Sequence, residues 1–222
     1  MEKCDKFWSR FVPATQRFCE DYVCGFVTHP AETWTNIGYF VVAYFLYQHI
    51  PRHDPMRRLA LSALCVGVGS TLFHASGTWL GEFCDISSMF LFSSFLIARN
   101  WARAFSQSPR HETVAYWTFV VGSSALLWWL PPVGTNLFIL HIVLAGCFEF
   151  ICLFRKRQFS FRRYRSLFVV ILFFGVAYSF WWVDRLEAWC PPTHWLTGHG
   201  LWHLFNAPCF WFAYQFYRRS DV

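Results

Sequence analysis

The chain has 222 residues, of which 55% are apolar, 22% are aromatic and only 14% are charged. Soluble domains carry roughly 25% charged residues, so this composition is typical of a membrane protein and excludes an ordinary soluble domain. The formal net charge of +6 does not indicate a nucleic-acid partner, because the basic residues lie in short clusters between apolar segments.

The N-terminal residues 1–33 are polar and precede the first apolar segment. They lack the apolar core of a signal peptide, so we expect the first membrane span to act as its own insertion signal. We interpret residues 1–33 as an extracytoplasmic segment of a single domain that covers 1–222.

Seven apolar segments follow in chain order. A membrane-spanning helix needs about 20 predominantly apolar residues. Segments of this kind occupy 34–50, 58–76, 83–101, 113–131, 134–154, 166–184 and 197–217. We therefore predict an all-α integral membrane protein, a multi-pass bundle of seven transmembrane helices.

The basic residues predict how this bundle is oriented. If the spans alternate, 14 of the 19 lysines and arginines fall on one side: Arg52, Arg57, Arg58, Arg99, Arg103, Arg110, the six between 155 and 165, Arg218 and Arg219. Cytoplasmic loops are enriched in lysine and arginine, so we predict a cytoplasmic C-terminus and an external N-terminus. The run 155–165 is most simply a topology signal, and binding to anionic headgroups is a second interpretation.

Polar residues that are costly at membrane depth gather at the external ends of the predicted spans. They are Glu32, Asn36, His74, Asp85, Asp184, His199 and His203. Such residues usually face the bundle interior and serve a function, so we predict that they form one site. Single histidines at other positions are expected to be interfacial or to bond a helix terminus; these are His49, His111 and His141.

Three of these histidines are candidate metal ligands. His199 and His203 are spaced i, i+4, which places both rings on one face of a helix, although Gly200 between them lowers helix propensity slightly. With His74 from the second span they would complete the three-histidine set of an open zinc site, whose fourth position takes water. Zinc lowers the pKa of that water towards about 7 and polarises a carbonyl, so we predict Zn²⁺-dependent hydrolysis.

Two further side chains are candidates for catalysis. Asp85 has two interpretations, a proton acceptor and shuttle or a carboxylate that orients a metal-binding histidine. Ser70 lies one helical turn before His74, so its hydroxyl faces the same side and can bond the substrate carbonyl. Its alternative role is to bond back to the carbonyl of Val66.

The expected substrate is a lipid within the bilayer. The predicted site lies at headgroup depth, and the spans offer no charged path for transport. We infer no obligate protein partner. The site would face the periplasm if the membrane is a bacterial inner membrane, or the lumen if it belongs to the endoplasmic reticulum or Golgi.

Taken together, these residues resemble the alkaline ceramidase family of seven-span zinc amidases. That family belongs to a wider set with the adiponectin-type receptors and the lipases that remodel GPI anchors. The matching pieces run in family order from residue 19 to 206: Cys19-Glu20, Asn36, Ser70-x-x-Phe73-His74, Asp85 with Ser88-Met89, Trp182-x-Asp184 and His199-x-x-x-His203. The segments around Cys19 and after Asp184 are more typical of ceramidases than of the wider set.

The resemblance implies roles for these positions. His74, His199 and His203 would bind zinc, Ser70 would stabilise the oxyanion, and Asp85 would handle the proton. The implied reaction is hydrolysis of the amide of ceramide, or of a related N-acyl lipid, to a sphingoid base and a fatty acid.

The calcium site of animal family members is not matched in full. Arg17 and Tyr22 stand where acidic and amide ligands are expected. Only a remnant of a Ca²⁺ site is therefore predicted, at Glu20, Glu32 and Asn36, with His29 as another possible contributor. The N-terminal pattern is more similar to the short bacterial branch of the family.

The nine cysteines divide by location. The family pattern implies that Cys19 pairs with Cys190 on the oxidising external side. Free thiols at these positions are the alternative, and a zinc site built on Cys19 and Cys24 is less well supported because it lacks partner ligands.

Three other functions remain open from the sequence. One is a lipid ester hydrolase of the GPI-remodelling type, with the same metal centre. Another is a non-catalytic seven-span receptor that keeps zinc for stability, although a structural zinc needs no open position. The third is a bis-histidine haem carrier, for which an i, i+4 pair on one helix is poor geometry.

Overall fold

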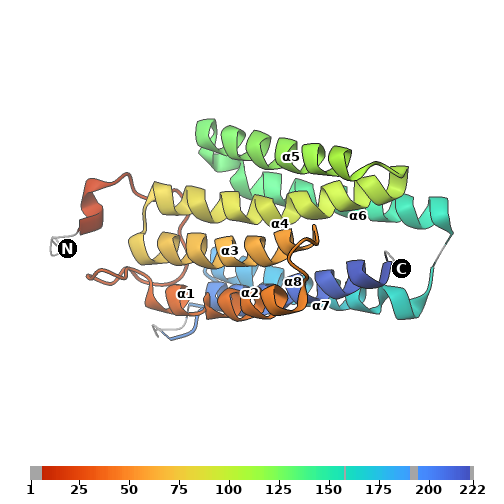
Figure 1. Cartoon of the computed structure of the whole chain (residues 1–222). Coiled ribbons are helices and arrows are strands. Elements are labelled where there is room, and N and C mark those ends of the chain that lie inside the picture. Colours follow the sequence, from red (N-terminus) through yellow and green to blue (C-terminus); the bar gives the residue numbers. More distant parts are fainter. Residues whose placement is uncertain (1–6, 158, 191–194, 221–222) are drawn as a thin grey trace.

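A computed structural model describes residues 7–157, 159–190 and 195–220. It contains two short 3-10 helices and eight α-helices (Figure 1): η1 (Phe7–Arg10), α1 (Pro30–Trp34), α2 (Ile37–His49), α3 (Arg57–Ser76), α4 (Trp79–Phe105), α5 (Pro109–Trp129), η2 (Pro131–Val133), α6 (Gly134–Lys156), α7 (Phe161–Arg185) and α8 (Gly198–Ser220). The all-α prediction is confirmed for these residues.

The long helices α2 to α8 each coincide with one predicted span. Four helical segments are long and apolar enough to cross a membrane, namely α3, α4, η2 with α6, and α7. The first predicted span is divided, because α1 ends at Trp34 and α2 begins at Ile37. The third begins earlier than predicted, at Trp79, because the Thr78 hydroxyl caps α4 by accepting the Gly81 N–H at 3.2 Å.

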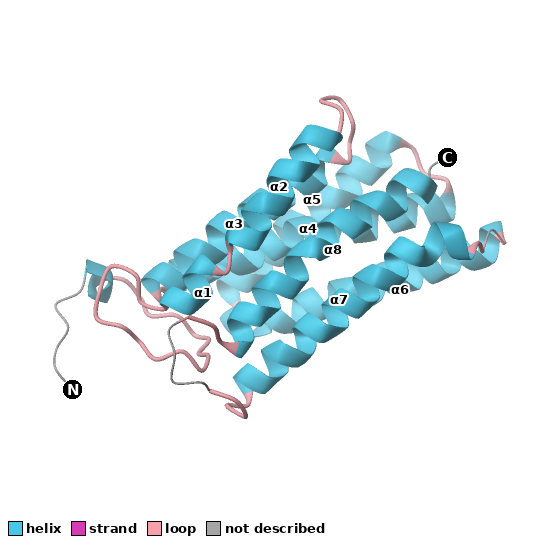
Figure 2. Cartoon of the chain, turned by 90° about the horizontal axis from the view of Figure 1, so that it is seen from below, coloured by secondary structure: helices cyan, strands magenta, loops and turns pink. Residues whose placement is uncertain are grey.

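The long helices run roughly along one axis (Figure 2). Each of α6, α4, α3, α2, α8 and α7 packs on the next in this order, and α5 packs on α4. Helices α6 and α7 follow each other in the sequence, yet α6 packs on α4 and α7 on α8. They therefore border the interior from opposite sides, bridged by Phe138 and Phe174 with ring centroids 6.2 Å apart.

Apolar side chains fill the interior and also cover the outside of the bundle. The larger core cluster lies among α2, α3, α4 and α8 and includes Tyr39, Leu59, Phe95 and Phe210. Outward-facing residues such as Val143, Phe150, Ile171 and Leu172 are more than half exposed. An apolar outer surface of this kind is expected where lipid replaces water as the solvent.

Polar networks connect the buried helices away from the end where α3 ends and α8 begins. Arg103 pairs with Glu149 at 2.6 Å, and Tyr164 donates to the same carboxylate at 2.8 Å. His141, predicted to be interfacial, is instead buried, with Ser93 at 3.0 Å from Nδ1 and Ser123 at 2.9 Å from Nε2. Burial is tolerated because both ring nitrogens have hydroxyl partners from α4 and α5.

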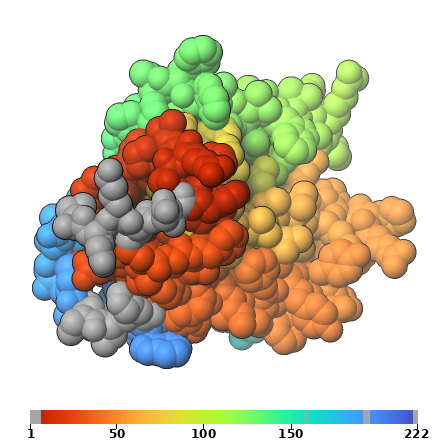
Figure 3. Space-filling model, turned by 90° about the vertical axis from the view of Figure 1, so that its left-hand side faces the viewer, coloured from red at the N-terminus to blue at the C-terminus, as the bar shows by residue number. Residues whose placement is uncertain are grey.

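The N-terminal segment lies across one end of the bundle (Figure 3). We call residues 12–20 the strap. Val12 accepts the Trp79 N–H at 2.8 Å, and Ala14 donates to Gly77 at 3.0 Å. The buried Glu82 carboxylate accepts the Thr15 hydroxyl at 2.6 Å. The strap is thereby fixed to the first turn of α4.

Candidate metal centre

Three buried imidazoles meet beneath the strap. His74 lies in the last turn of α3, and His199 and His203 lie in the first two turns of α8. Their side chains are 1%, 4% and 2% exposed, respectively. One ligand atom from each lies within 4.8 Å of the others. The structure thus brings together the three histidines that the sequence singled out, from helices about 125 residues apart.

Close helix packing makes this convergence possible. A Cβ at Gly69 of α3 would lie 2.8 Å from the Cys84 carbonyl oxygen of α4, so only glycine allows the two backbones to approach there. Gly200 weakens the helix locally, but close packing also explains why a glycine stands at this position. A Cβ at this position would lie 3.1 Å from Thr35, which follows α1. The glycine lets α8 approach the residue that bonds His203.

Hydrogen bonds on Nδ1 orient two of the rings. The Glu32 carboxylate lies 2.8 Å from Nδ1 of His74. Thr35 donates its hydroxyl proton to backbone carbonyls, 2.9 Å from that of Ala31, so it accepts from Nδ1 of His203 at 3.0 Å. With Nδ1 protonated in both rings, Nε2 carries the lone pair that a metal ion requires.

Unpaired nitrogen atoms mark the space between the rings. Nε2 of His74 and both ring nitrogens of His199 are buried without a hydrogen-bond partner among the described residues. A buried polar atom left unpaired costs about 1–3 kcal/mol, so native structures rarely contain several together. A divalent cation bound by these nitrogens removes that cost, and three neutral imidazoles are ligands that suit zinc. The donor set therefore fits the metal predicted from the sequence.

The surroundings of the Glu32 carboxylate disfavour its negative charge. Its side chain is 1% exposed, and burial raises its pKa well above the ordinary value, with the nearby carboxylates Asp184 and Glu20 adding to the rise. A cation held by His74 would act against this rise in the pKa of Glu32, because positive charge favours the carboxylate form.

Ser70 and Asp85 lie beside the histidines. The Ser70 hydroxyl is 3.3 Å from Nε2 of His203, rather than bonded back to Val66. It also interacts with the side chain of Asp85, which is 9% exposed. Asp85 lines the same cavity as His199 but is not one of the three grouped ligands.

A small cavity of about 40 Å³ connects this group to the space between α6 and α7. Asp85 and His199 contribute polar walls. The other lining residues are Gln16 and Phe18 of the strap, Phe73, Ile86, Met89, Thr135, Phe138, Ile139, Tyr178, Trp181 and Trp202. The volume is that of one or two water molecules, so water fits beside the histidines and Asp85 without rearrangement.

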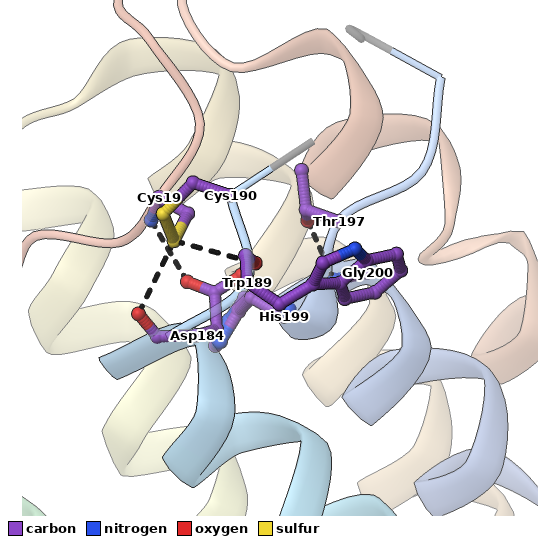
Figure 4. Close-up of a disulfide and its surroundings, with 7 residues drawn as sticks. All are labelled: Cys19, Asp184, Trp189, Cys190, Thr197, His199 and Gly200. Carbon is purple, nitrogen blue, oxygen red and sulfur yellow. Dashed lines mark hydrogen bonds between the residues drawn. A yellow bond between two sulfur atoms is a disulfide. The ribbon is translucent and has the colours of Figure 1, made fainter. Parts of the chain in front are cut away.

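A carboxylate at the end of α7 links the strap to the start of α8, and a disulfide fixes the strap to the segment after α7 (Figure 4). Asp184 Oδ1 accepts the Cys19 N–H and Oδ2 accepts the His199 N–H, each at 2.8 Å. The structure contains a disulfide between Cys19 and Cys190, the pair implied by the family resemblance, with Cα atoms 5.2 Å apart. Phe18 then stacks on His199 with ring centroids 3.7 Å apart.

We expect Asp184→Asn to destabilise the protein by about 1–3 kcal/mol, because an amide NH₂ replaces one of two oxygens that accept buried backbone N–H groups. A fall in the midpoint of thermal unfolding of the detergent-solubilised protein measures this effect. The matched control is Asp21→Asn, an exposed acid next to the strap. An unchanged midpoint for Asp184→Asn would show that the carboxylate does not anchor α8.

The residues of the predicted calcium remnant make other contacts. Glu20 accepts the N–H groups of Ala31 and Glu32 at 2.8 and 2.9 Å, and so caps α1. Glu32 orients His74, as described above. Asn36 donates its amide to the Glu32 carbonyl at 2.9 Å, and its Oδ1 is buried without a hydrogen-bond partner among the described residues.

The chain was compared with protein families and with curated proteins. The family described as Ceramidase matches residues 12–221, which includes every residue of the metal centre and the whole strap. A comparison with curated proteins found no match.

Proposed function

The chain belongs to the ceramidase family, and on this premise we propose that it is a membrane-embedded, zinc-dependent amidase. Membership of the family indicates an enzyme that hydrolyses ceramide. The observation that carries the finer proposal is the group of three buried imidazoles with unpaired nitrogens. Three histidines leave a zinc ion with one open coordination position, and a carboxylate, a hydroxyl and a cavity that admits water lie beside them. This arrangement is typical of a catalytic zinc site and not of a structural one.

His74, His199 and His203 would hold the zinc ion in this proposal. When bound, zinc supplies a Lewis acid that polarises a carbonyl and makes water acidic at neutral pH. Glu32 and Thr35 hold two of the rings so that Nε2 faces the ion. Their contribution is to fix the orientation of the ligands before the substrate arrives.

Asp85 and Ser70 would carry the proton and the charge of the reaction. Asp85 takes a proton from the attacking water and returns one to the nitrogen of the leaving amine as the C–N bond breaks. Ser70 donates to the developing oxyanion of the amide carbonyl. The products are a fatty acid and a sphingoid base, and Asp85 is regenerated at the end of the cycle.

The substrate would reach the site from the bilayer. The cavity is walled by apolar residues of α6 and α7, the two helices that border the interior from opposite sides. At about 40 Å³ it is too small for an acyl chain. Substrate entry therefore requires side chains such as Phe138 and Trp181 to move apart. The strap covers the end of the bundle, so we propose that a lipid enters between the helices and not past the strap.

We further propose seven membrane spans with the metal centre on the non-cytoplasmic side. The predicted span 34–50, which contains α2, would join α5 and α8 to raise the four spans identified by length and apolarity to seven. The clusters of arginine lie at the end of the bundle opposite to the histidines, as the positive-inside rule requires. The disulfide lies at the same end as the histidines, where an oxidising compartment allows it to persist.

We expect the purified, full-length protein to release fatty acid from ceramide in mixed micelles faster than from a diacyl phospholipid. Removal of the metal with a chelator should abolish the release, and added Zn²⁺ should restore it. Release from the phospholipid alone would instead favour the ester hydrolase. Zinc bound in stoichiometric amount without hydrolysis of either lipid would favour the receptor.

A further inference from the structure

A second cavity lies at the end of the bundle opposite to the metal centre. It has a volume of about 780 Å³ and is formed by the start of α7 and the ends of α2 and α8. Helix α8 has 23 residues and is therefore about 34 Å long, close to the thickness of the hydrocarbon core. In the proposed seven-span arrangement, in which His199 is in the first turn of the span formed by α8, this cavity lies at the other membrane interface.

Positive charge dominates the rim of the cavity. Four of its lining residues are arginines, Arg162 and Arg163 from α7 and Arg218 and Arg219 from α8, and none of its lining residues is acidic. Arg162 and Arg218 are exposed. Arg219 donates to Ser166 at 2.7 Å, a neutral partner, and experiences repulsion from Arg162, Arg165 and Arg218. An anion placed among these guanidinium groups relieves the repulsion and accepts several hydrogen bonds.

The backbone at the start of α7 adds to this field. Ser160 precedes the helix and also lines the cavity, but its side chain makes no capping hydrogen bond. The first N–H groups of a helix have no intrahelical partner and carry partial positive charge. The partial positive charge at this end of α7 adds to that of the arginines, and a phosphate has more oxygens than a carboxylate to accept bonds from several donors.

Aromatic residues form another part of the cavity lining. Trp211 and Tyr214 of α8 and Phe159 line it, and His49 of α2 packs edge-on against Trp211 with ring centroids 5.1 Å apart. A free phosphate ion has no apolar part that could pack on these rings. A phospholipid uses both parts, with its phosphate among the arginines and its glycerol and upper acyl chains on the aromatic rings.

We propose that this cavity is a binding site for the headgroup of an anionic phospholipid, separate from the metal centre. A bound lipid contacts α2, α7 and α8 together and thereby stabilises the packing of α7 on α8. The proposal is independent of the hydrolytic function, because none of the residues that line this cavity also lines the cavity beside the histidines.

The test compares lipids and variants by native mass spectrometry of the full-length protein in neutral detergent. We expect the wild type to retain phosphatidylglycerol at least fivefold more than phosphatidylcholine. Arg162→Gln with Arg218→Gln should lower this retention at least fivefold, since both are exposed rim residues whose loss leaves the fold intact. The control is Arg52→Gln with Lys156→Gln, which removes equal charge outside the cavity and should keep both lipid retention and basal activity.

Three results would overturn the proposal. Equal retention of the two lipids would exclude selection of negative charge. An equal loss in the control pair would mean that diffuse surface charge, and not this cavity, holds the lipid. In a parallel thermal unfolding measurement, inorganic phosphate at the same concentration should stabilise the wild type much less than phosphatidylglycerol does. Equal stabilisation by the two would reassign the cavity to a free anion.

Discussion

Replacing Asp85 by asparagine is expected to lower the rate of ceramide hydrolysis by about 10²–10⁴-fold while leaving one zinc ion per chain. The substitution keeps the size of the side chain and its contact with Ser70, but it removes the only acidic group among the residues that line the cavity beside the histidines. The attacking water then lacks a proton acceptor. Fatty-acid release and metal content, measured on the same preparation, test both parts.

The outcome also separates the two interpretations of Asp85. If Asp85→Asn loses zinc together with activity, the carboxylate orients the ligands and the proton role fails. If neither changes, Asp85 is outside the machinery. Asp54→Asn, in the loop before α3 at the far end of the bundle, is the matched control and should retain both zinc and turnover.

Substitution of His203 by glutamine should remove the bound zinc and lower turnover by about 10³-fold or more, to the level of the metal-free protein. Glutamine fills much of the space of the imidazole but is a poor ligand for zinc, and the two remaining histidines leave the ion with too few donors. Metal content and ceramide hydrolysis are the measurements. Full zinc occupancy in this variant would contradict the three-histidine site.

His141 provides the matched control for this experiment. It is also a buried, hydrogen-bonded histidine in the same bundle, but its partners are the hydroxyls of Ser93 and Ser123. His141→Gln should retain zinc and turnover, even if it lowers the unfolding midpoint. A comparable loss of zinc in both variants would mean that burial of histidine, and not ligation, explains the effect.

The ligand set could be predicted because two regularities of membrane proteins agree. The i, i+4 spacing places His199 and His203 on one helical face, and alternation of the spans places His74 at the same membrane side. Helix location followed from apolar segment length alone. These rules depend on sequence order and periodicity, so they need no knowledge of side-chain contacts.

The residues that orient the ligands could not be predicted in this way. Thr35 bonds His203 because the chain turns between α1 and α2. This turn lies inside the predicted span 34–50, where the apolar pattern gives no sign of a break. Glu32 was assigned to a calcium remnant from the resemblance, yet its carboxylate contacts His74. His141 was expected at an interface because no sequence rule indicated that two serines from other helices would meet its ring.

The crosslink between Cys19 and Cys190 bears on how the enzyme matures. It holds the strap so that Phe18 covers His199, while all three imidazoles are at most 4% exposed. An ion has to be loaded before this closure forms, or during a rare excursion of the phenylalanine. In the proposed enzyme, metallation is therefore part of biosynthesis, and a loaded ion exchanges slowly with its surroundings.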